Sequence, residues 1–172
     1  MTKSELRKAL LQKRALMTQE DVRLKSQKIV DQVRNDARYK HAKKVAIFYP
    51  MGTEVNLLDL LKDEKVFLFP RVEKDGIHFY PYHKDMTFIR SKFGVLEPSG
   101  TVNEDDSIDF MLAPALAISK ELYRIGYGKG YYDQFLSKHR PKTVVGVIYD
   151  YLNKITFDHD AHDQKLDDVI EG

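Results

Sequence analysis

A short glycine-rich segment in the second half of the chain holds the residues best suited to chemistry. Residues 124–133 have the sequence RIGYGKGYYD, with glycine at three alternate positions. Glycine lets the backbone adopt positive φ and approach a ligand closely, so successive amides in such a segment can converge on an anion. Arg124 and Lys129 add positive charge at the same place. The segment therefore predicts a phosphate-binding loop.

The residues after the glycines favour the same interpretation. A helix is expected over 131–138, and its positive N-terminal end would face the anion. Asp133 lies in the first turn of this helix, where a carboxylate either offsets the helix dipole or, beside bound phosphates, ligates magnesium. The segment matches neither standard nucleotide motif, because the Gly-x-Gly-x-x-Gly spacing fails and no Gly-Lys-Ser/Thr sequence exists. A purely structural glycine turn remains the alternative.

Charged residues elsewhere could belong to the same site. Lys3, Arg7 and Arg14 are four and seven residues apart, which places them on one face of an expected helix, where a solvated basic face is the alternative. Glu54 and Arg71 follow the first two expected strands, at the end where α/β sheets carry ligand-binding groups. Glu54 could instead be a carboxylate at a helix start, and Arg71 could be a surface arginine.

The C-terminal tail offers a second group of possible metal ligands, in the sequence His159-Asp160-Ala161-His162-Asp163. Two histidines three residues apart on a polar tail usually face solvent, so a transition-metal site is not expected. Asp163 is a plausible magnesium ligand only if the tail folds back onto the body of the protein.

These residues need a scaffold, and the hydrophobic pattern predicts an α/β fold. Residues 2–5 and 18–21 each place a hydroxyl three residues before a carboxylate, the spacing typical of a helix start, and so predict a helical hairpin at the front. Short apolar runs at 45–49 and 66–69 predict buried strands, with a helix near 57–61 between them. A strand-helix-strand unit implies that its two strands are parallel.

The later segments continue this pattern. Residues 77–82 predict a strand that forms a hairpin with 66–69. Residues 84–109 have little regular pattern and predict a surface excursion that could close over a site. The remaining expected elements are a central strand with its continuation at 110–118, a helix at 131–138 and a last strong strand at 143–148.

Composition limits the class of protein. The chain has 172 residues and 20.0 kDa, which favours a single domain over residues 1–172. It has no cysteine, so disulfides, thiolate metal sites and a cysteine nucleophile are excluded. The apolar runs are shorter than the roughly 18 residues that span a bilayer, and the first residues lack a signal-like apolar core. We therefore expect a cytoplasmic protein with no membrane partner.

Charge is unevenly distributed along the chain. The net charge is +2, but residues 1–44 hold thirteen Lys/Arg against five Asp/Glu, which leaves the remainder acidic. The basic front could attract nucleic acid, whereas the acidic remainder would repel a long polyanion. A small phosphorylated ligand is therefore the better match.

The order of these motifs resembles the 5-formyltetrahydrofolate cyclo-ligase family, also called methenyltetrahydrofolate synthetase. The resemblance rests on Pro114–Ile118 followed by the segment 124–133, and its Gly-x-Gly-x-Gly-Tyr-Tyr-Asp core is specific. It covers nearly the whole chain, since further matching pieces occur in order at Lys3–Arg7, Phe48–Glu54, Pro70-Arg71, Gly94–Pro98, His162-Asp163 and Leu166-Asp167.

The resemblance implies a three-layer α/β/α sandwich with a mainly parallel central sheet. It also implies an ATP- and Mg²⁺-dependent enzyme that converts 5-formyltetrahydrofolate into 5,10-methenyltetrahydrofolate and releases ADP and phosphate. In the family the formyl oxygen is thought to take the γ-phosphoryl group of ATP, after which N10 attacks the iminium phosphate. No protein nucleophile is required, so catalysis would depend on positioning and charge stabilisation.

Carried over by position, the resemblance assigns a role to each motif. ATP binding falls to Lys3, Ser4, Glu5, Leu6, Arg7, Arg124, Ile125, Gly126, Tyr127, Gly128, Lys129, Gly130, Tyr131 and Tyr132, among which Arg124 and Lys129 would be catalytic. Folate binding falls to Tyr49, Glu54, Tyr127, Gly128, Lys129, Gly130 and Tyr131. Asp133 and Asp163 would serve magnesium. The expected partners are ATP and 5-formyltetrahydrofolate, without nucleic acid, and the expected state is a monomer.

Three positions depart from the family pattern. Ala115–Ser119 stands where the family often has Gly-Leu-Ala-Phe-Asp, and Leu122 lies near the position of a usual glycine. The loop there is therefore expected to be reshaped. Leu152 replaces a common glutamine, which puts a polar contact at that point in doubt.

Two other functions compete with this hypothesis. A nucleotide- or RNA-binding module that uses the basic front would show polynucleotide affinity that falls steeply with salt. A sugar-phosphate isomerase would bind phosphate in the same loop without needing ATP, but the sequence shows no dedicated acid/base pair for it.

Overall fold

Two helices begin the chain where the capping pattern predicts them. A computed structural model describes residues 1–172, with α1 at Lys3–Ala15 and α2 at Gln19–Asn35. The Thr2 hydroxyl accepts a hydrogen bond from the Glu5 amide at 3.1 Å, and Thr18 forms a complete capping box with Asp21. These side chains satisfy amides that have no partner within the helix. A short third helix that was not predicted, α3, spans Ala37–His41.

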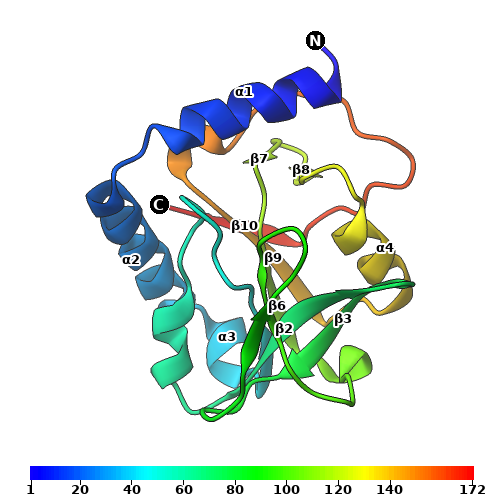
Figure 1. The fold of residues 1–172 in the computed structure, drawn as a ribbon. Coiled ribbons are helices and arrows are strands. Elements are labelled where there is room, and N and C mark those ends of the chain that lie inside the picture. Colours follow the sequence, from blue (N-terminus) through cyan, green and yellow to red (C-terminus); the bar gives the residue numbers. More distant parts are fainter.

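The two front helices do not form the expected hairpin. α2 packs beside α3 and the strand β10 (Asp168–Glu171), whereas α1 lies across one end of the sheet (Figure 1). Ile29, Val30 and Val33 of α2 belong to the central core, so its apolar face is buried against the sheet. Because α2 and not α1 covers this face of the sheet, α1 can lie against the loops at the end of the sheet.

The central sheet has six strands in the order β10-β9-β6-β1-β2-β3. Neighbouring strands from β10 to β2 are parallel, and β3 pairs antiparallel with β2. The strands besides β10 are β1 (Lys44–Ala46), β2 (Val66–Glu73), β3 (Gly76–Pro81), β6 (Phe110–Ala113) and β9 (Thr143–Ile148). The expected strands, the parallel pairing and the hairpin are thus confirmed, although β1 ends at Ala46 and the edge strand β10 was not predicted.

The connections contain shorter elements than expected in some places. The helix expected near 57–61 is a 3-10 helix, η1 (Leu58–Lys62). The excursion at 84–109 contains a two-stranded antiparallel pair and a 3-10 turn, and the strand expected at 110–118 breaks after β6 into a separate small hairpin. These elements are β4 (Phe88–Arg90), β5 (Leu96–Pro98), η2 (Asp105–Ser107), β7 (Ala117–Ile118), β8 (Arg124–Ile125), α4 (Tyr131–Lys138) and η3 (Asp150–Leu152).

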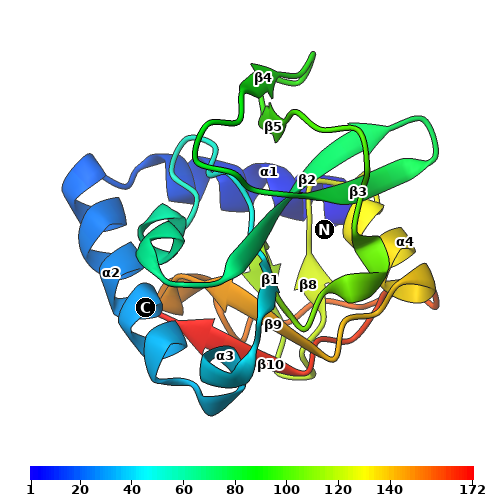
Figure 2. The same cartoon turned by 90° about the horizontal axis from the view of Figure 1, so that it is seen from below.

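The elements form three layers around the sheet. α2 and α3 lie on one side and α4 on the other, as Figures 1 and 2 show. The chain runs from β1 to its neighbour β2 in one direction and from β6 to β9 in the other. The order therefore reverses between β1 and β6, and open α/β sheets bind their ligands at the carboxyl ends of strands beside such a reversal. None of the helices combines the length and the apolarity needed to cross a membrane.

Candidate active site

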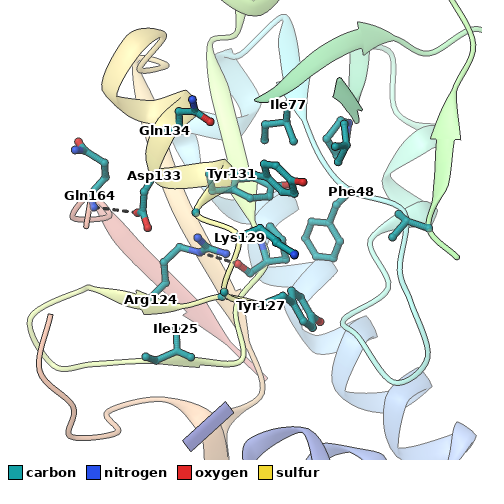
Figure 3. A pocket seen from close by; sticks show the side chains of 18 of the residues that line it. Phe48, Ile77, Arg124, Ile125, Tyr127, Lys129, Tyr131, Asp133, Gln134 and Gln164 are labelled. Carbon is teal, nitrogen blue, oxygen red and sulfur yellow. Dashed lines mark hydrogen bonds between the residues drawn. The ribbon is translucent and has the colours of Figure 1, made fainter. Parts of the chain in front are cut away.

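A cavity of about 880 Å³ brings together most of the residues that the sequence singles out (Figure 3). Its wall includes Phe48 and Glu54 after β1, Pro114 after β6, and residues 124–134 of the glycine-rich segment. Segments far apart in the chain complete the wall, namely one face of α1, part of the 84–109 excursion and the tail at 160–164. The cavity thus lies at the carboxyl ends of β1 and β6, where the strand order reverses.

The glycine-rich loop presents free backbone amides. None of the amides from Gly126 to Asp133 donates to a backbone acceptor, and Gln134 makes the first bond of α4, to the Gly130 carbonyl at 2.9 Å. The amides of the loop and of the first helical turn are therefore available to a ligand. Together with the positive end of α4, they form an anion-binding site.

Two of the loop glycines are required by geometry. Gly130 precedes α4 with a φ of 70°, a left-handed conformation that glycine adopts without steric cost. A Cβ atom at Gly126 would lie 2.8 Å from Nη2 of Arg124, so any side chain there would displace the guanidinium. The glycine spacing thus shapes the backbone and also leaves room for the cation beneath it.

Arg124 is a buried cation with two free nitrogens. Its residue is 8% exposed, its Nε donates to the Pro114 carbonyl at 2.9 Å, and its guanidinium lies 4.9 Å from the Tyr132 ring centroid. No carboxylate lies within 4.0 Å of it, and neither Nη atom has a hydrogen-bond acceptor in the protein. Burial lowers the pKa of this guanidinium, while Asp133 opposes the shift. An anion in the cavity would therefore be its natural partner.

Three further cations surround the loop. The Arg7 Nε donates to the Gly126 carbonyl at 3.0 Å and so fixes the loop to α1. Lys129 is exposed at the cavity wall without a carboxylate partner, and its Nζ lies 5.7 Å from the Phe93 ring centroid. Lys3 is held by Asp160 and Asp163, at 2.8 and 3.1 Å. The face of α1 that carries Lys3 and Arg7 is thus part of the cavity wall and not a fully solvated surface.

Glu54 lies in a hydrogen-bonded chain at the inner end of the cavity. Its Oε1 accepts from the Met51 amide at 2.7 Å, and its Oε2 accepts from the Tyr127 hydroxyl at 2.9 Å. The same hydroxyl accepts from Nη2 of Arg14 at 2.8 Å. Burial raises the pKa of Glu54, and the Met51 amide, Arg14, Tyr127 and Arg124 act against that shift.

The two predicted magnesium ligands reach the cavity from α4 and from the C-terminal tail. Asp133 and Asp163 both line the cavity, because the Gln164 amide donates to Oδ1 of Asp133 at 3.0 Å and so holds the tail against α4. Oδ2 of Asp133 has no partner in the protein, whereas Oδ2 of Asp163 accepts from Lys3. No group of three His, Asp or Glu side chains is arranged to hold a metal by itself. Two carboxylates beside an anion site fit Mg²⁺, which is commonly bound by one or two carboxylates together with phosphates.

Some predicted residues lie elsewhere. Ser4 and Glu5 are exposed on α1 and do not line the cavity, and Leu6 packs against the core. Arg71 also points away from it, because side chains alternate along a strand and its neighbours on β2 are the ones that line the wall. Its Nη1 donates to the Gly100 carbonyl at 3.0 Å. His159 stacks on Tyr123 with ring centroids 3.7 Å apart, away from the cavity wall.

The remaining members of the predicted set are at the cavity. Tyr49 lines it and contacts Phe88 with ring centroids 5.2 Å apart. The other predicted residues that line the wall are Ile125, Gly126, Gly128, Gly130, Tyr131 and Tyr132.

The cavity wall also contains residues to which the sequence assigned no role at the site. Phe93 and Glu97 belong to the irregular excursion, which was predicted only as a segment that could close over a site. Glu97 lies in the matching piece Gly94–Pro98, to which no role at the site was assigned. Oε2 of Glu97 accepts from the Val72 amide at 2.7 Å and ties β5 to β2. Gln134 and Gln164 also line the wall, and no local pattern marked either of them.

The departures from the family pattern have clear local structures. Leu122 adopts a φ of 69°, a left-handed conformation that costs a leucine roughly 1–2 kcal/mol and a glycine nothing. Ser119 is buried, and its Oγ accepts from the Tyr123 amide at 3.2 Å. Leu152 is fully buried in the core and offers the cavity no polar group.

A mainly parallel α/β sheet with a loop of free amides beside its reversal point defines an α/β protein whose cavity is suited to an anionic ligand. Comparison with known proteins is more specific. The model of the 5-formyltetrahydrofolate cyclo-ligase family matches residues 1–172. The chain therefore belongs to this family, whose members are ligases.

Individual relatives agree with the family match. The 5-formyltetrahydrofolate cyclo-ligase of Mycoplasma pneumoniae is 33% identical over 180 residues, with 99% of this chain and 98% of the relative covered. The mouse (Mus musculus) 5-formyltetrahydrofolate cyclo-ligase is 28% identical, with 98% and 90% covered. The NMR structure of Aquifex aeolicus 5,10-methenyltetrahydrofolate synthetase superimposes with a TM-score of 0.88 at 34% identity, covering 99% of this chain and 90% of that one.

Proposed function

We propose that this protein uses ATP to convert 5-formyltetrahydrofolate into 5,10-methenyltetrahydrofolate, with release of ADP and phosphate. The observation that carries the proposal is the run of free amides at residues 126–133 beside Arg124 and Lys129. A cavity of about 880 Å³ lies at the upper end of the 300–1,000 Å³ typical of ligand sites, so there is room for a nucleotide and a second ligand.

The chemistry needs the formyl oxygen to become a leaving group. That oxygen attacks the γ-phosphorus of ATP, an O–P bond forms, and the bond to the β,γ-bridging oxygen breaks as ADP leaves. The N10 lone pair then attacks the formyl carbon, N10 loses its proton, and phosphate departs with the electrons of the C–O bond. Each step separates or moves negative charge on phosphate oxygens, which fixed cations and amides stabilise.

Different residues of the cavity would bind the two substrates. Lys3, Arg7 and residues 124–132 would hold ATP, with Arg124 and Lys129 stabilising the charge of the transferred group. Tyr49 would contact the folate ring. The Glu54 carboxylate is suited to accept hydrogen bonds from the amino-pyrimidinone edge of the pteridine, because a carboxylate can accept from two donors side by side.

Magnesium would be held by Asp133 and Asp163. Bound there, Mg²⁺ would neutralise part of the phosphate charge. Asp163 is paired with Lys3, so we expect that pair to separate when metal and nucleotide bind and Lys3 to turn to the phosphates.

The direct test is a turnover assay with the folded protein. We expect the absorbance of methenyltetrahydrofolate to appear from 5-formyltetrahydrofolate only when both ATP and Mg²⁺ are present, with one ADP formed per product. Failure of well-folded protein to form this product would overturn the proposal.

A further inference from the structure

Arg14 is a buried cation that the large cavity does not use. Its residue is 6% exposed at the C-terminal end of α1, and it does not line the 880 Å³ cavity. No carboxylate lies within 4.0 Å of it, and its Nε is buried without a hydrogen-bond partner. A buried charge is costly unless something compensates for it. The negative end of α1 provides one compensation, and the Tyr127 hydroxyl provides another.

The direction of the hydrogen bonds beyond Arg14 is fixed by chemistry. A guanidinium can only donate, so the Tyr127 oxygen accepts from Nη2 of Arg14 at 2.8 Å. The single hydroxyl proton of Tyr127 is then directed to Oε2 of Glu54, 2.9 Å away. That oxygen must accept, as must Oε1, which faces the Met51 amide at 2.7 Å. Both oxygens of Glu54 thus face donors, an arrangement that favours the ionised form of the side chain.

The positive charges around Glu54 also favour its ionised form. Burial raises the pKa of Glu54, and Arg14 is the first of the charged side chains that oppose this shift, ahead of Arg124. The other titratable groups that interact with Glu54 are the hydroxyls of Tyr127, Tyr132 and Tyr149, all of which remain neutral near pH 7 because burial raises the pKa of each. Arg14 is therefore the main cation behind Glu54 that is not itself part of the anion site.

We propose that Arg14 is a positioning residue, which acts through Tyr127 to keep Glu54 ionised and oriented toward the folate without touching either substrate. This inference rests on the proposed function in one respect, the role of Glu54 in binding the pteridine. It replaces the expectation that Arg14 could belong to the phosphate site together with Lys3 and Arg7, since Arg14 lies behind Tyr127 and Glu54 and outside the wall of the large cavity.

Steady-state kinetics separate the two roles. With Arg14→Met we expect KM for 5-formyltetrahydrofolate to rise about tenfold, the usual cost of a lost hydrogen bond to a charged group, while KM for ATP stays within twofold. Arg14→Lys keeps the charge and should recover most of the loss. A rise in KM for ATP equal to that for the folate, or no change in either constant, would overturn the proposal.

A second measurement does not depend on turnover. In protein labelled with ¹³C at glutamate side chains, the Glu54 carboxyl signal is identified by its loss in Glu54→Gln and then followed as a function of pH. Loss of the nearby positive charge in Arg14→Met should raise the midpoint by about one pH unit, and Arg14→Lys should leave it near the wild-type value. An unchanged midpoint in folded Arg14→Met refutes the inference.

The two measurements fail in distinguishable ways. If wild-type protein gives no methenyltetrahydrofolate, the proposed function fails, and the carboxyl titration still decides whether Arg14 controls Glu54. If Arg14→Met does not fold, Tyr127→Phe removes the intermediate hydroxyl and leaves Arg14 in place. We expect Tyr127→Phe also to raise the midpoint of the Glu54 carboxyl titration, but by less than Arg14→Met does. An unchanged midpoint would count against the role of the hydrogen bonds that connect Arg14, Tyr127 and Glu54.

Discussion

The cationic side chains of the site are of two kinds, those without a carboxylate partner and those already paired with one. Arg124 and Lys129 have no carboxylate partner, so nothing in the protein competes with an anion for them. Lys3 is already paired with Asp160 and Asp163, so a phosphate must displace those carboxylates before Lys3 can bind it. We therefore expect Arg124 and Lys129 to contribute more to the first contact with ATP than Lys3 does.

The assigned role of Asp133 leads to a test by a single charge change. Asp133→Asn removes the negative charge, but the amide oxygen can still accept from the Gln164 amide as Oδ1 does now. We expect the magnesium concentration for half-maximal turnover to rise tenfold or more, a loss of about 1.4 kcal/mol of binding, with little change in thermal stability. Magnesium titrations at fixed ATP provide the measurement.

A matched control for Asp133→Asn is Asp31→Asn. Asp31 is an exposed carboxylate on α2, and Gln27 donates to its Oδ1 at 2.9 Å, so the same charge is removed far from the cavity. Wild-type magnesium dependence in the Asp133 variant, or an equal effect in the Asp31 variant, would contradict the assignment.

His78 is a residue whose protonation should affect stability. Its Nδ1 lies 2.6 Å from Oδ2 of Asp105 and its Nε2 lies 2.7 Å from Oδ1 of Asp75, and only the doubly protonated ring can donate to both. These two hydrogen bonds raise the pKa of His78 above its ordinary value of 6.5. The added stability is therefore complete below pH 6.5 and is lost as the pH rises through the higher pKa of the folded state.

Substitution of His78 tests this sign. We expect His78→Gln to lower the melting temperature by a few degrees at about pH 6 and by less at about pH 9, because the wild-type protein has lost the charged contact there. His83→Gln removes an exposed histidine and serves as the control. A difference that grows toward alkaline pH would show that the neutral ring makes the stabilising contacts.

Among the elements, the small β7–β8 hairpin links the sheet to the anion-binding loop. β8 ends at Ile125, directly before the first loop glycine, and β7 lies against β9 near Gly146. A Cβ at Gly146 would lie 2.6 Å from Cδ1 of Ile118 and 2.7 Å from Cδ1 of Leu166. Because Gly146 has no side chain, the β7–β8 hairpin and the C-terminal tail can pack closely against β9.

This packing predicts an overpacked variant and its partial rescue. Gly146→Ala should lower the free energy of unfolding by about 1–3 kcal/mol, measured by urea denaturation. Ile118→Val removes one of the two atoms in the way, so the double variant should be more stable than the sum of the single effects predicts. Strict additivity of the two substitutions would mean that β9 and the hairpin adjust independently.

The secondary structure shows which elements local sequence patterns can predict. Both front helices and the inner strands were predictable, because capping residues and apolar runs specify them within a few neighbouring residues. β10 was missed because Asp168-Val169-Ile170-Glu171 has only two apolar residues, and pairing with β9 alone makes it a strand. The hairpin of α1 and α2 was wrong because amphipathic spacing shows that a helix has an apolar face but not which element covers it.

At the scale of the whole molecule, the uneven charge of the sequence is partly matched within the fold. Arg34 pairs with Asp59 and Asp63, and Arg38 pairs with Asp168, so cations of the front meet acids of the remainder. Mostly exposed pairs of this kind contribute little stability each. They do reduce the positive charge that the front presents to solvent, and Arg7, Arg124 and Lys129, which have no carboxylate partner, line the cavity.

Ligand binding to the whole chain gives a stability prediction. ATP with Mg²⁺ at about 100 times its Kd should stabilise the folded state by about 2.7 kcal/mol, which for a domain of this size is a rise of roughly 5–10 °C in the melting temperature. Scanning calorimetry provides the measurement, with ATP plus a magnesium chelator as the control. A melting temperature that MgATP does not change would contradict binding at the free amides.

The site was partly predictable for the same reason as the fold. The glycine spacing marked the loop, and the positions of Lys3 and Arg7 one helical turn apart marked a shared face. The contribution of Phe93 and Glu97 to the wall could not be predicted, because it depends on how an irregular segment folds back over β2. Arg14 was placed on one helix face with Lys3 and Arg7 but is buried outside the wall of the large cavity, since spacing along a helix does not show what lies beneath its end.

The unpaired amides between Gly126 and Asp133 mean that this chain does not complete its own backbone hydrogen bonding. The missing acceptors have to be supplied by solvent or by an incoming anion, so a bound anion would complete the hydrogen bonding of this loop. The amide hydrogens of residues 126–133 should therefore exchange quickly with deuterated water in the free protein and slowly once phosphates are bound. Their exchange rates would thus report whether the site is occupied.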